Sequence, residues 1–199
     1  RRTMPKTKDL YIDIGAASKA AAEDKVSLGD YGVFDSAVVE FGDGLIKAKA
    51  IDDRVGCAAL LKLIEDEPPI DTWFCFTVQE EVGLRGAASM AYALDPGFAM
   101  VLEGTTAADL AEVEGGKAVC RVRGGVVLPF MDGATIYDAE LFELLRNACD
   151  KRGIRWQTKT RVAGGTDAGR IHKSRAGVRV CAAAAPVRYI HSPSSVAAV

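Results

Sequence analysis

Hydrophobic and polar positions along the chain change their spacing several times, and each change marks a predicted element. Apolar residues recur at helical spacing over residues 138–152, and Gly153 follows as a C-cap, so this segment is predicted to be a helix. Shorter helices are predicted at residues 20–22, 57–65, 86–92 and 168–172. The first of these has Ser18 as its N-cap.

Compact apolar runs bounded by glycine or charged residues predict the strands. These runs occupy residues 9–15, 38–41, 45–50, 74–78, 98–102, 119–122, 126–128, 154–160 and 178–184. Apolar and acidic residues alternate over 9–15, as in a half-exposed strand, whereas 74–78 is rich in aromatic and β-branched residues and is predicted to be buried. Residues 42–44 are Gly-Asp-Gly, which predicts a hairpin between the strands on either side.

The order of these elements predicts the fold class. Beyond Ala50 strands alternate with helices, which indicates an α/β fold with a largely parallel sheet covered on both faces. Before that point the chain has short strands and turns. We therefore expect a small β-rich element in residues 1–47 and the main domain in residues 48–199.

Composition narrows the class of protein. The 199 residues can bury a sizeable core, and 25 basic against 27 acidic residues give a net charge of -2, so nothing favours a nucleic acid or a membrane surface as partner. No stretch resembles a transmembrane segment or a signal peptide. The five scattered cysteines indicate reduced thiols in a cytoplasmic protein.

Candidate chemistry lies just beyond or between the predicted elements. The side chains concerned are those of Asp52, Glu80, Glu81, Glu103, Asp167 and His191. In an open α/β sheet, ligands bind outside the carboxyl ends of the strands. Carboxylates with an imidazole and without thiolates suit zinc, cobalt or manganese, and a bridging carboxylate can hold two ions about 3.5–4 Å apart. One glutamate of the 80–81 pair could ligate metal while its neighbour acts as a general base.

Each motif also has a purely structural interpretation. Residues 52–54, Asp-Asp-Arg, are typical of a helix N-cap with a surface salt bridge. The pair Glu80 and Glu81 could be a solvated strand edge, and residues 164–167 could form a turn with a helix N-cap. His172 is flanked by basic residues, so we expect it on the surface.

Taken in order, five motifs carry a resemblance. They are DDRVG at 52–56, QEEVGLRG at 79–86, EGTTAAD at 103–109, GGTDA at 164–168 and RYIHSP at 188–193. This ordered set resembles the glutamyl or deblocking aminopeptidases of the tetrahedral aminopeptidase type, some of which are labelled endoglucanases. The resemblance spans nearly the whole chain.

The resemblance implies a cytoplasmic metallo-aminopeptidase with two divalent metal ions, zinc or cobalt with manganese as the alternative, usually assembled as a dodecamer. By motif, Asp52 would bridge both metals and Glu80 would be the general base. Glu81 and His191 would complete one metal, while Glu103 would serve the other. The implied fold is a three-layer α/β/α sandwich of the zinc-peptidase kind, acting on peptides.

The same resemblance implies that Gly165, Thr166 and Asp167 line the substrate site. Two departures from the family follow. Residues 1–51 contain no histidine, so the upstream His-x-Asp ligand of the metal held by Glu103 is not found. Residues 1–47 then represent a remnant of the smaller β-domain, and the catalytic domain would be truncated at its C-terminal end.

Three functions follow as hypotheses. The favoured one is a metallo-aminopeptidase that acts on free N-termini. The second is a catalytically incomplete fragment that retains the fold. The third is a carboxylate-pair glycoside hydrolase, which is disfavoured because the adjacent Glu80 and Glu81 are poorly disposed to flank a sugar bond.

Overall fold

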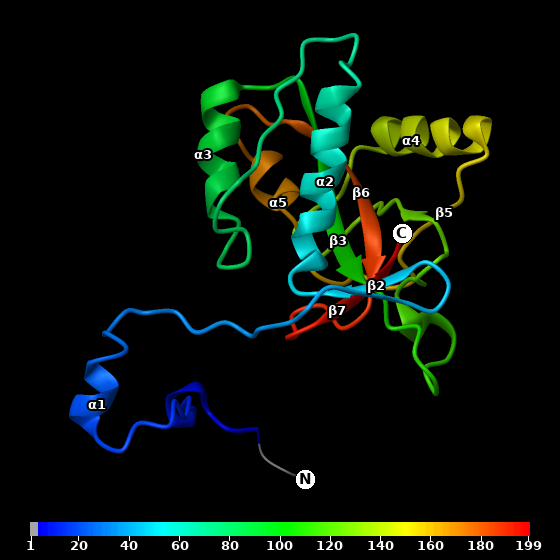
Figure 1. Ribbon diagram of the computed structural model, residues 1–199. Helices are drawn as coiled ribbons and strands as arrows, with labels where there is room; N and C mark the ends of the chain where they lie inside the picture. The colour runs from blue at the N-terminus through cyan, green and yellow to red at the C-terminus, as the bar shows by residue number, and fades with distance from the viewer. Residues whose placement is uncertain (1–3) are drawn as a thin grey trace. The chain divides into compact units, whose positions relative to one another are not determined.

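The computed structural model describes residues 4–199 (Figure 1). By chain contacts it divides into two compact units, Arg1–Phe34 and Asp35–Val199. Its elements in chain order are η1 (Thr7–Asp9), α1 (Lys19–Glu23), β1 (Val39–Phe41), β2 (Leu45–Ala48), α2 (Ile51–Glu65), α3 (Arg85–Leu94), β3 (Phe98–Thr106), η2 (Gly115–Ala118), β4 (Val126–Val127), α4 (Ala139–Arg152), β5 (Trp156–Gln157), α5 (Ala168–Ile171), β6 (Arg179–Val187) and β7 (Ser195–Ala198).

The first unit contains the short helices η1 and α1. The Ser18 hydroxyl accepts a hydrogen bond from the Ala21 N–H at 3.2 Å, which confirms the predicted cap of α1. The predicted strand over residues 9–15 is wrong. Among the described residues this segment has no strand partner, and alternation alone cannot satisfy the backbone donors and acceptors of a strand.

The second unit is built around a sheet with strand order β3-β6-β4-β5. β3 and β6 run parallel from Phe98 opposite Arg179 to Thr106 opposite Val187. β4 pairs parallel with β5, and one antiparallel pairing joins β4 to β6. The sheet is therefore mixed and largely parallel, as predicted.

A second, antiparallel sheet has the order β1-β2-β7. The hairpin of β1 and β2 confirms the prediction from Gly42-Asp43-Gly44. β7, which pairs with β2 from Leu45 opposite Ala198 onward, was not predicted, because residues 195–198 are small and lack a strand-like pattern. The assignment of residues 1–47 to a separate β-rich domain stays a prediction.

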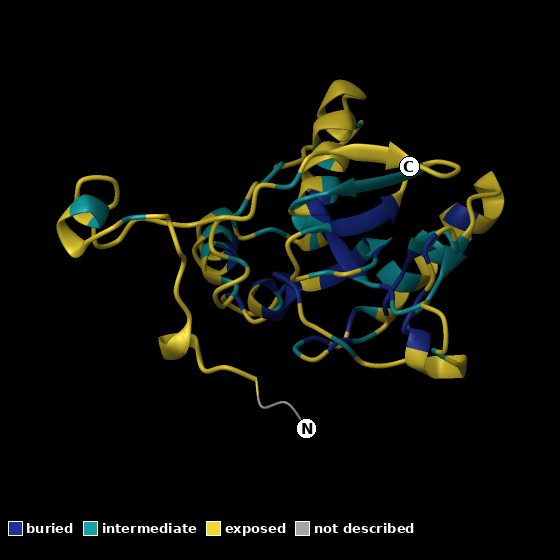
Figure 2. Ribbon diagram, turned by 60° about the horizontal axis from the view of Figure 1, so that its bottom comes forward, coloured by how far each residue is buried: buried dark blue, intermediate teal, exposed yellow. Residues whose placement is uncertain are grey.

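Helices cover both faces of the main sheet, and the central strands are the most buried part of the unit (Figure 2). One core cluster joins α3, α5, β3 and β6 through Ala87, Ala91, Val101, Ala168, Ile171, Val180 and Ala182. Because neighbouring residues on a strand point to opposite faces, Leu102 and Ala183 lie on the other side, beside Val55 and Ala59 of α2. This arrangement agrees with the predicted α/β/α layers.

Helix α4 follows the sequence signals closely. The Asp138 carboxylate accepts a hydrogen bond from the Leu141 N–H at 3.0 Å, and Gly153 ends the helix with a φ of 65°. Arg179 at the start of β6 donates two hydrogen bonds to the same carboxylate, which joins the helix to the sheet. In the described part of the chain, no helix has both the length and the apolar character needed to cross a bilayer.

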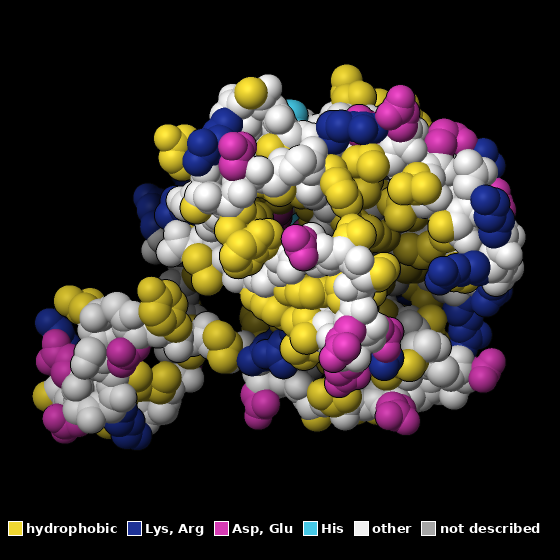
Figure 3. Space-filling view, turned by 90° about the horizontal axis from the view of Figure 1, so that it is seen from above, with side chains coloured by type: hydrophobic (Ala, Val, Ile, Leu, Met, Phe, Trp, Pro, Cys, Tyr) yellow, Lys and Arg dark blue, Asp and Glu magenta, His cyan; other side chains and the backbone are white. Residues whose placement is uncertain are grey.

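The predicted buried strand at residues 74–78 is not a strand among the described residues. The segment is partly exposed: Phe76 is 49% exposed and Val78 is 68% exposed, and the preceding Trp73 is 73% exposed. The hydrophobic pattern predicted burial, but burial requires a neighbouring strand, and no described strand pairs with this segment. Figure 3 shows hydrophobic side chains gathered around a hollow on one face of the molecule.

The predicted strand at residues 119–122 is also wrong. Val119 has a φ of 61°, and its carbonyl accepts hydrogen bonds from the Thr160 N–H and hydroxyl rather than from a strand neighbour. The Val122 N–H donates to the Asp109 carboxylate. Val119, Cys120 and Val122 are buried in a loop. Their hydrophobicity therefore predicted burial correctly, but the predicted strand geometry is wrong.

Candidate metal and catalytic site

Two groups of possible metal ligands meet at the start of α2. The first contains Asp52, Glu81 and His191, and the second contains Asp52, Asp53 and Glu103. Within each group, one ligand atom per residue lies within 4.8 Å of the others. Asp52 belongs to both groups. The structure thus brings all four residues predicted as metal ligands into these two groups, and the residue predicted to bridge two metals is the one the groups share.

Asp52 and Asp53 occupy the first turn of α2, where their backbone angles are not helical and the peptide bond between them is cis. Two glycines make room for these carboxylates. A Cβ on Gly104 would lie 2.7 Å from Asp52 Oδ1, and a Cβ on Gly56 would lie 2.6 Å from Asp53 Oδ1. The Gly56 N–H also donates a hydrogen bond to Asp53 Oδ1 at 3.0 Å. Side chains at either glycine would therefore displace the carboxylates.

Glu80 and Glu81 lie in a closed turn that leads into α3. The N–H groups of Gly83 and Leu84 donate to the Glu80 carbonyl at 3.0 and 2.8 Å. The Gly86 N–H donates to the Val78 carbonyl at 3.0 Å, and this approach is so close that a Cβ on Gly86 would lie 2.6 Å from the same oxygen. The turn therefore holds its two glutamates on a well-defined backbone.

His191 lies in the loop between β6 and β7. Its Nε2 is 3.2 Å from Glu81 Oε2 and 3.8 Å from Asp52 Oδ2. The Ser192 hydroxyl donates to the Tyr189 carbonyl, and His191 itself adopts a φ of 56°, so the loop turns sharply at the imidazole. With 67% of its side chain exposed, His191 forms the solvent side of the first group.

The electrostatics of Glu80 indicate a site that lacks positive charge. Burial is the largest cause that raises the pKa of Glu80 to about 7, and the carboxylates of Glu81, Asp167, Asp52 and Asp53 raise it further. Every charge in this list is negative. Without a cation, a carboxylic acid with such a pKa is partly protonated near neutral pH.

The second group also contains carboxyl groups whose pKa values are raised by burial and by neighbouring carboxylates. Burial raises the pKa of Asp53 to about 7, opposed by the hydrogen bond from Gly56, and Asp52 adds to the rise. Burial also raises the pKa of Glu103 to about 10, with further contributions from Asp53 and Asp52. A divalent cation would compensate these charges, and carboxylate oxygens with one imidazole are a donor set that zinc, cobalt and manganese accept. The residues present therefore fit a metal ion.

These shifts predict an unusual pH dependence for the metal-free protein. Carboxyl groups in the unfolded chain titrate near pH 4, so between about pH 4 and pH 7 the folded protein binds more protons than the unfolded one. The metal-free protein should therefore lose stability as the pH rises from about 5 to about 8, measured as a falling Tm in the presence of a chelator. The groups responsible are Glu80, Asp53 and Glu103.

Two controls accompany this prediction. Glu103→Gln removes the group whose pKa is raised most, so this variant should show a flatter dependence of Tm on pH. Added zinc should raise Tm more at about pH 8 than at about pH 5, because the ligands must be deprotonated to bind. A Tm of the metal-free protein that rises across this range would contradict the assignment.

The loop of Gly165, Thr166 and Asp167 has a more buried position than a substrate-lining role requires. Thr166 and Asp167 are each only 6% exposed, and the Thr166 hydroxyl lies 3.2 Å from the buried Tyr137 hydroxyl. Burial raises the pKa of Asp167, whose side chain accepts a hydrogen bond from Thr77. The assignment of these residues to the substrate site stays a prediction.

Sequence reasoning missed Asp53 as a possible ligand. Residues 52–54 were interpreted either as a helix cap or, through Asp52 alone, as a metal ligand, whereas the structure brings Asp53 into the second group. The signal was present as two adjacent acidic residues before a glycine. His172, which was expected on the surface, is half-buried: its Nδ1 lies 2.7 Å from the Ala168 carbonyl, and neither candidate group of the described residues includes it.

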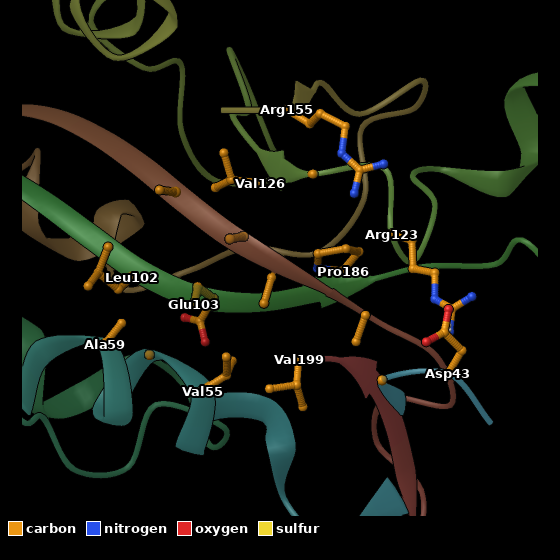
Figure 4. A pocket seen from close by; sticks show the side chains of 17 residues that line it. Asp43, Val55, Ala59, Leu102, Glu103, Arg123, Val126, Arg155, Pro186 and Val199 are labelled. Atoms are coloured by element: carbon orange, nitrogen blue, oxygen red, sulfur yellow. Dashed lines mark ion pairs between the residues drawn. The ribbon is translucent and has the colours of Figure 1, made fainter. Parts of the chain in front are cut away.

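A cavity of about 590 Å³ borders the second group on the α2 side of the sheet (Figure 4). Glu103 and Leu102 of β3 lie on one wall, with Val55 of α2 nearby, and Arg123 lies at the far end within 3.9 Å of Asp43. Cavities of this size hold small molecules or side chains in many proteins. The Glu103 carboxylate is therefore next to open space although only 8% of the residue is exposed.

The fold and the ligand types first define a class: an α/β protein with carboxylates and a histidine gathered beside a pair of parallel strands. Comparison with known proteins is more specific. The M42 glutamyl aminopeptidase family matches residues 1–199, and the chain belongs to that family. The family consists of aminopeptidases, which are hydrolases.

Individual relatives agree with this membership. The chain is 30% identical over 200 residues to the glutamyl aminopeptidase of Lactococcus lactis, a match that covers 97% of this chain and 55% of that protein. Aminopeptidase APDkam598 from the archaeon Desulfurococcus kamchatkensis superposes with a TM-score of 0.93 at 35% identity, covering 99% of this chain and 57% of that one.

A more distant structure is the TET1 peptidase of Pyrococcus horikoshii, which can assemble into a tetrahedron or a large octahedral shell. It superposes with a TM-score of 0.75 at 28% identity, covering 94% of this chain and 55% of that one. The chain thus spans between 55% and 57% of the length of these relatives.

Proposed function

We propose that this chain carries the catalytic chemistry of a metal-dependent aminopeptidase that removes N-terminal residues from peptides. The observation that supports this most directly is the position of Asp52, which is shared by two groups of possible ligands. A single carboxylate between two ligand groups is the arrangement that a two-metal site requires. Membership of the M42 glutamyl aminopeptidase family supports the same reaction.

The proposed ligands are Asp52, Glu81 and His191 for one ion, and Asp52 with Glu103 for the other. Asp53 adds a third carboxylate to the second group, where the upstream histidine expected from the family is not found in residues 1–51. Zinc or cobalt fits the first group, and manganese also fits the second because its donors are all oxygens. Bound divalent ions would polarise the scissile carbonyl and lower the pKa of water.

Glu80 is the proposed general base. It neighbours Glu81 on the same turn, and its charge acts on the same carboxylates, so it lies close to the ligand groups. In the proposed reaction the Glu80 carboxylate accepts a proton from the attacking water and then delivers it to the leaving amine. Both steps require a group that accepts and then releases the proton, as a glutamate side chain beside the water can do.

The substrate, assembly and location are proposed from family membership, the assemblies of a relative and the state of the cysteines. Peptides with free N-termini follow from the aminopeptidase family. A homo-oligomer, with the dodecamer as the predicted form, is supported by the large assemblies of the Pyrococcus horikoshii relative. All five cysteines are free, which suits the reducing environment of the cytoplasm.

Metal removal tests the proposed function. Aminoacyl-anilide hydrolysis by the purified chain should be lost after dialysis against a chelator and should return when zinc or cobalt is added. The loss should reach the detection limit, because Glu80 alone has no group to stabilise the developing oxyanion. If the metal-replete protein is inert on a full panel of aminoacyl-anilides yet binds zinc, the fold-retaining, catalytically incomplete form is the better description.

A further inference from the structure

The segment that precedes the candidate catalytic turn has little to hold it in place. Residues 71–77 form no regular secondary structure and no described strand pairs with them, and Trp73 and Phe76 are 73% and 49% exposed. Strands are normally held by two rows of backbone hydrogen bonds, which this segment does not have within the described chain. Glu80 and Glu81 follow directly, so their position depends on other contacts.

The turn itself is internally closed. The Val78, Gln79 and Glu80 carbonyls accept hydrogen bonds from the N–H groups of residues 83–86, at distances between 2.8 and 3.2 Å. Gly86 packs against the Val78 backbone so closely that any side chain there would clash. The turn thus behaves as one piece, and a contact at its base can position both glutamates.

One side-chain contact joins the base of this turn to the core. The Thr77 hydroxyl donates a hydrogen bond of 2.5 Å to Asp167 Oδ2, across 90 positions of sequence. Asp167 directly precedes α5, whose Ala168 and Ile171 belong to the main core cluster, and only 6% of Asp167 is exposed. Asp167 is therefore a rigid acceptor for Thr77.

The hydrogen bond from Thr77 also fixes the orientation of the Asp167 carboxylate. Its second oxygen, Oδ1, is buried without a hydrogen-bond partner among the described residues. Since that oxygen is not exposed, a substrate group cannot reach it without a rearrangement, which argues against direct substrate binding. Loss of its single hydrogen bond would leave a buried carboxylate unsatisfied, which costs free energy. The bond to Thr77 therefore favours one orientation of the Asp167 side chain.

We propose that Asp167 and Thr77 are positioning residues: their hydrogen bond ties the turn of Glu80 and Glu81 to α5 and so sets both glutamates relative to Asp52 and His191. This inference rests on the proposed function, because it assigns these residues a role only if Glu80 and Glu81 act in the metal centre. It differs from the role implied by resemblance, in which Asp167 lines the substrate site.

The test compares three variants of the full chain. Thr77→Val removes the hydroxyl and keeps the shape, Thr77→Ser keeps a hydroxyl, and Thr72→Val is the matched control. Thr72 lies on the same segment, but its hydroxyl donates only to the nearby Ile70 carbonyl. Zinc affinity is measured by titration calorimetry, kcat and KM with an aminoacyl-anilide, and folding by circular dichroism.

Thr77→Val is expected to lower both zinc affinity and kcat by about tenfold or more, because contacts that orient metal ligands have effects of this size. KM should change by less than about twofold, since the substrate contacts stay in place. Thr77→Ser should restore both values, and Thr72→Val should match the wild type. Equal zinc affinity and kcat in Thr77→Val and the wild type would overturn the inference while leaving the proposed function intact.

Two further outcomes are decisive. If Thr77→Val does not fold, Thr77→Ala replaces it: the hydroxyl is again lost, so zinc affinity and kcat should still fall by about tenfold while KM changes by less than about twofold. Wild-type zinc affinity and kcat in a folded Thr77→Ala variant would overturn the inference. A wild-type chain that neither binds zinc nor hydrolyses the anilide would refute the proposed function and this inference together.

Discussion

Replacement of Glu80 by glutamine is expected to lower kcat for aminoacyl-anilide hydrolysis by a factor of about 10²–10⁴. The amide cannot accept the proton from water, yet its size and position match those of the glutamate. Zinc binding should be retained, because Glu80 belongs to neither group of candidate ligands. The measurement combines steady-state kinetics with the zinc content of the purified variant.

Glu114→Gln is the matched control for this experiment. Glu114 is an exposed glutamate at the start of η2, and its side chain makes no capping hydrogen bond. The same chemical change there should leave kcat within about twofold of the wild type. If Glu80→Gln keeps full activity, another group accepts the proton and the assignment of Glu80 is wrong.

Asp52→Asn should have the broadest effect on metal binding. Asp52 contributes to both ligand groups, so its loss should weaken both ions and abolish measurable hydrolysis. The metal-free variant should nevertheless be more stable than the metal-free wild type at about pH 8, because Asp52 raises the pKa of Asp53 by repulsion and that of Glu103 by a side-chain hydrogen bond and by repulsion. Thermal unfolding with and without zinc measures both effects.

The Tm values of Asp52→Asn with and without zinc distinguish a metal ligand from a structural carboxylate. A structural role for Asp52 predicts a lower Tm in both conditions, whereas a ligand role predicts a higher Tm without metal and a smaller gain on adding zinc. Asp43→Asn is the control, since Asp43 is an exposed carboxylate that, among the described residues, forms just one long ion pair, with Arg123. Wild-type zinc stoichiometry in Asp52→Asn would contradict the shared-ligand assignment.

The second ligand group bears on whether this chain can bind two ions. Family resemblance implied a missing histidine, which would leave Glu103 and Asp52 as the protein ligands of one metal. The structure adds Asp53, whose carboxylate lies within reach of the same point. Catalytic metal sites often have three protein ligands, so the described residues supply enough donors for each of two positions.

Local signals in the sequence predicted most of the helices and the main parallel strands. Ser18 and Gly153 act as caps where they were expected, since a cap depends on neighbours a few residues away, whereas Asp138, predicted as the first helical residue, is the N-cap of α4. β3 and β6 were predicted from apolar runs, and both prove longer than those runs. Signals of this kind need no knowledge of the rest of the fold.

The chemical types at the site were also predictable, but their grouping was not. The ordered motifs predicted Asp52, Glu81, Glu103 and His191 as metal ligands, and the structure brings these residues together in two groups. Asp53 was missed, because whether the second of two adjacent acidic residues turns toward the first depends on the backbone at the start of α2. The cavity beside Glu103 was equally invisible in the sequence.

The sequence by itself determined the element types with strong periodicity and the kinds of side chain that end the strands, because both follow from short-range spacing. Only the tertiary structure decided which apolar runs find a partner: residues 74–78 have the composition of a buried strand but remain unpaired among the described residues. It also decided which distant groups meet, as Thr77 and Asp167 do. Burial and long-range hydrogen bonds depend on residues far along the chain. The spacing of hydrophobic residues reports only local structure, so it does not predict these partners.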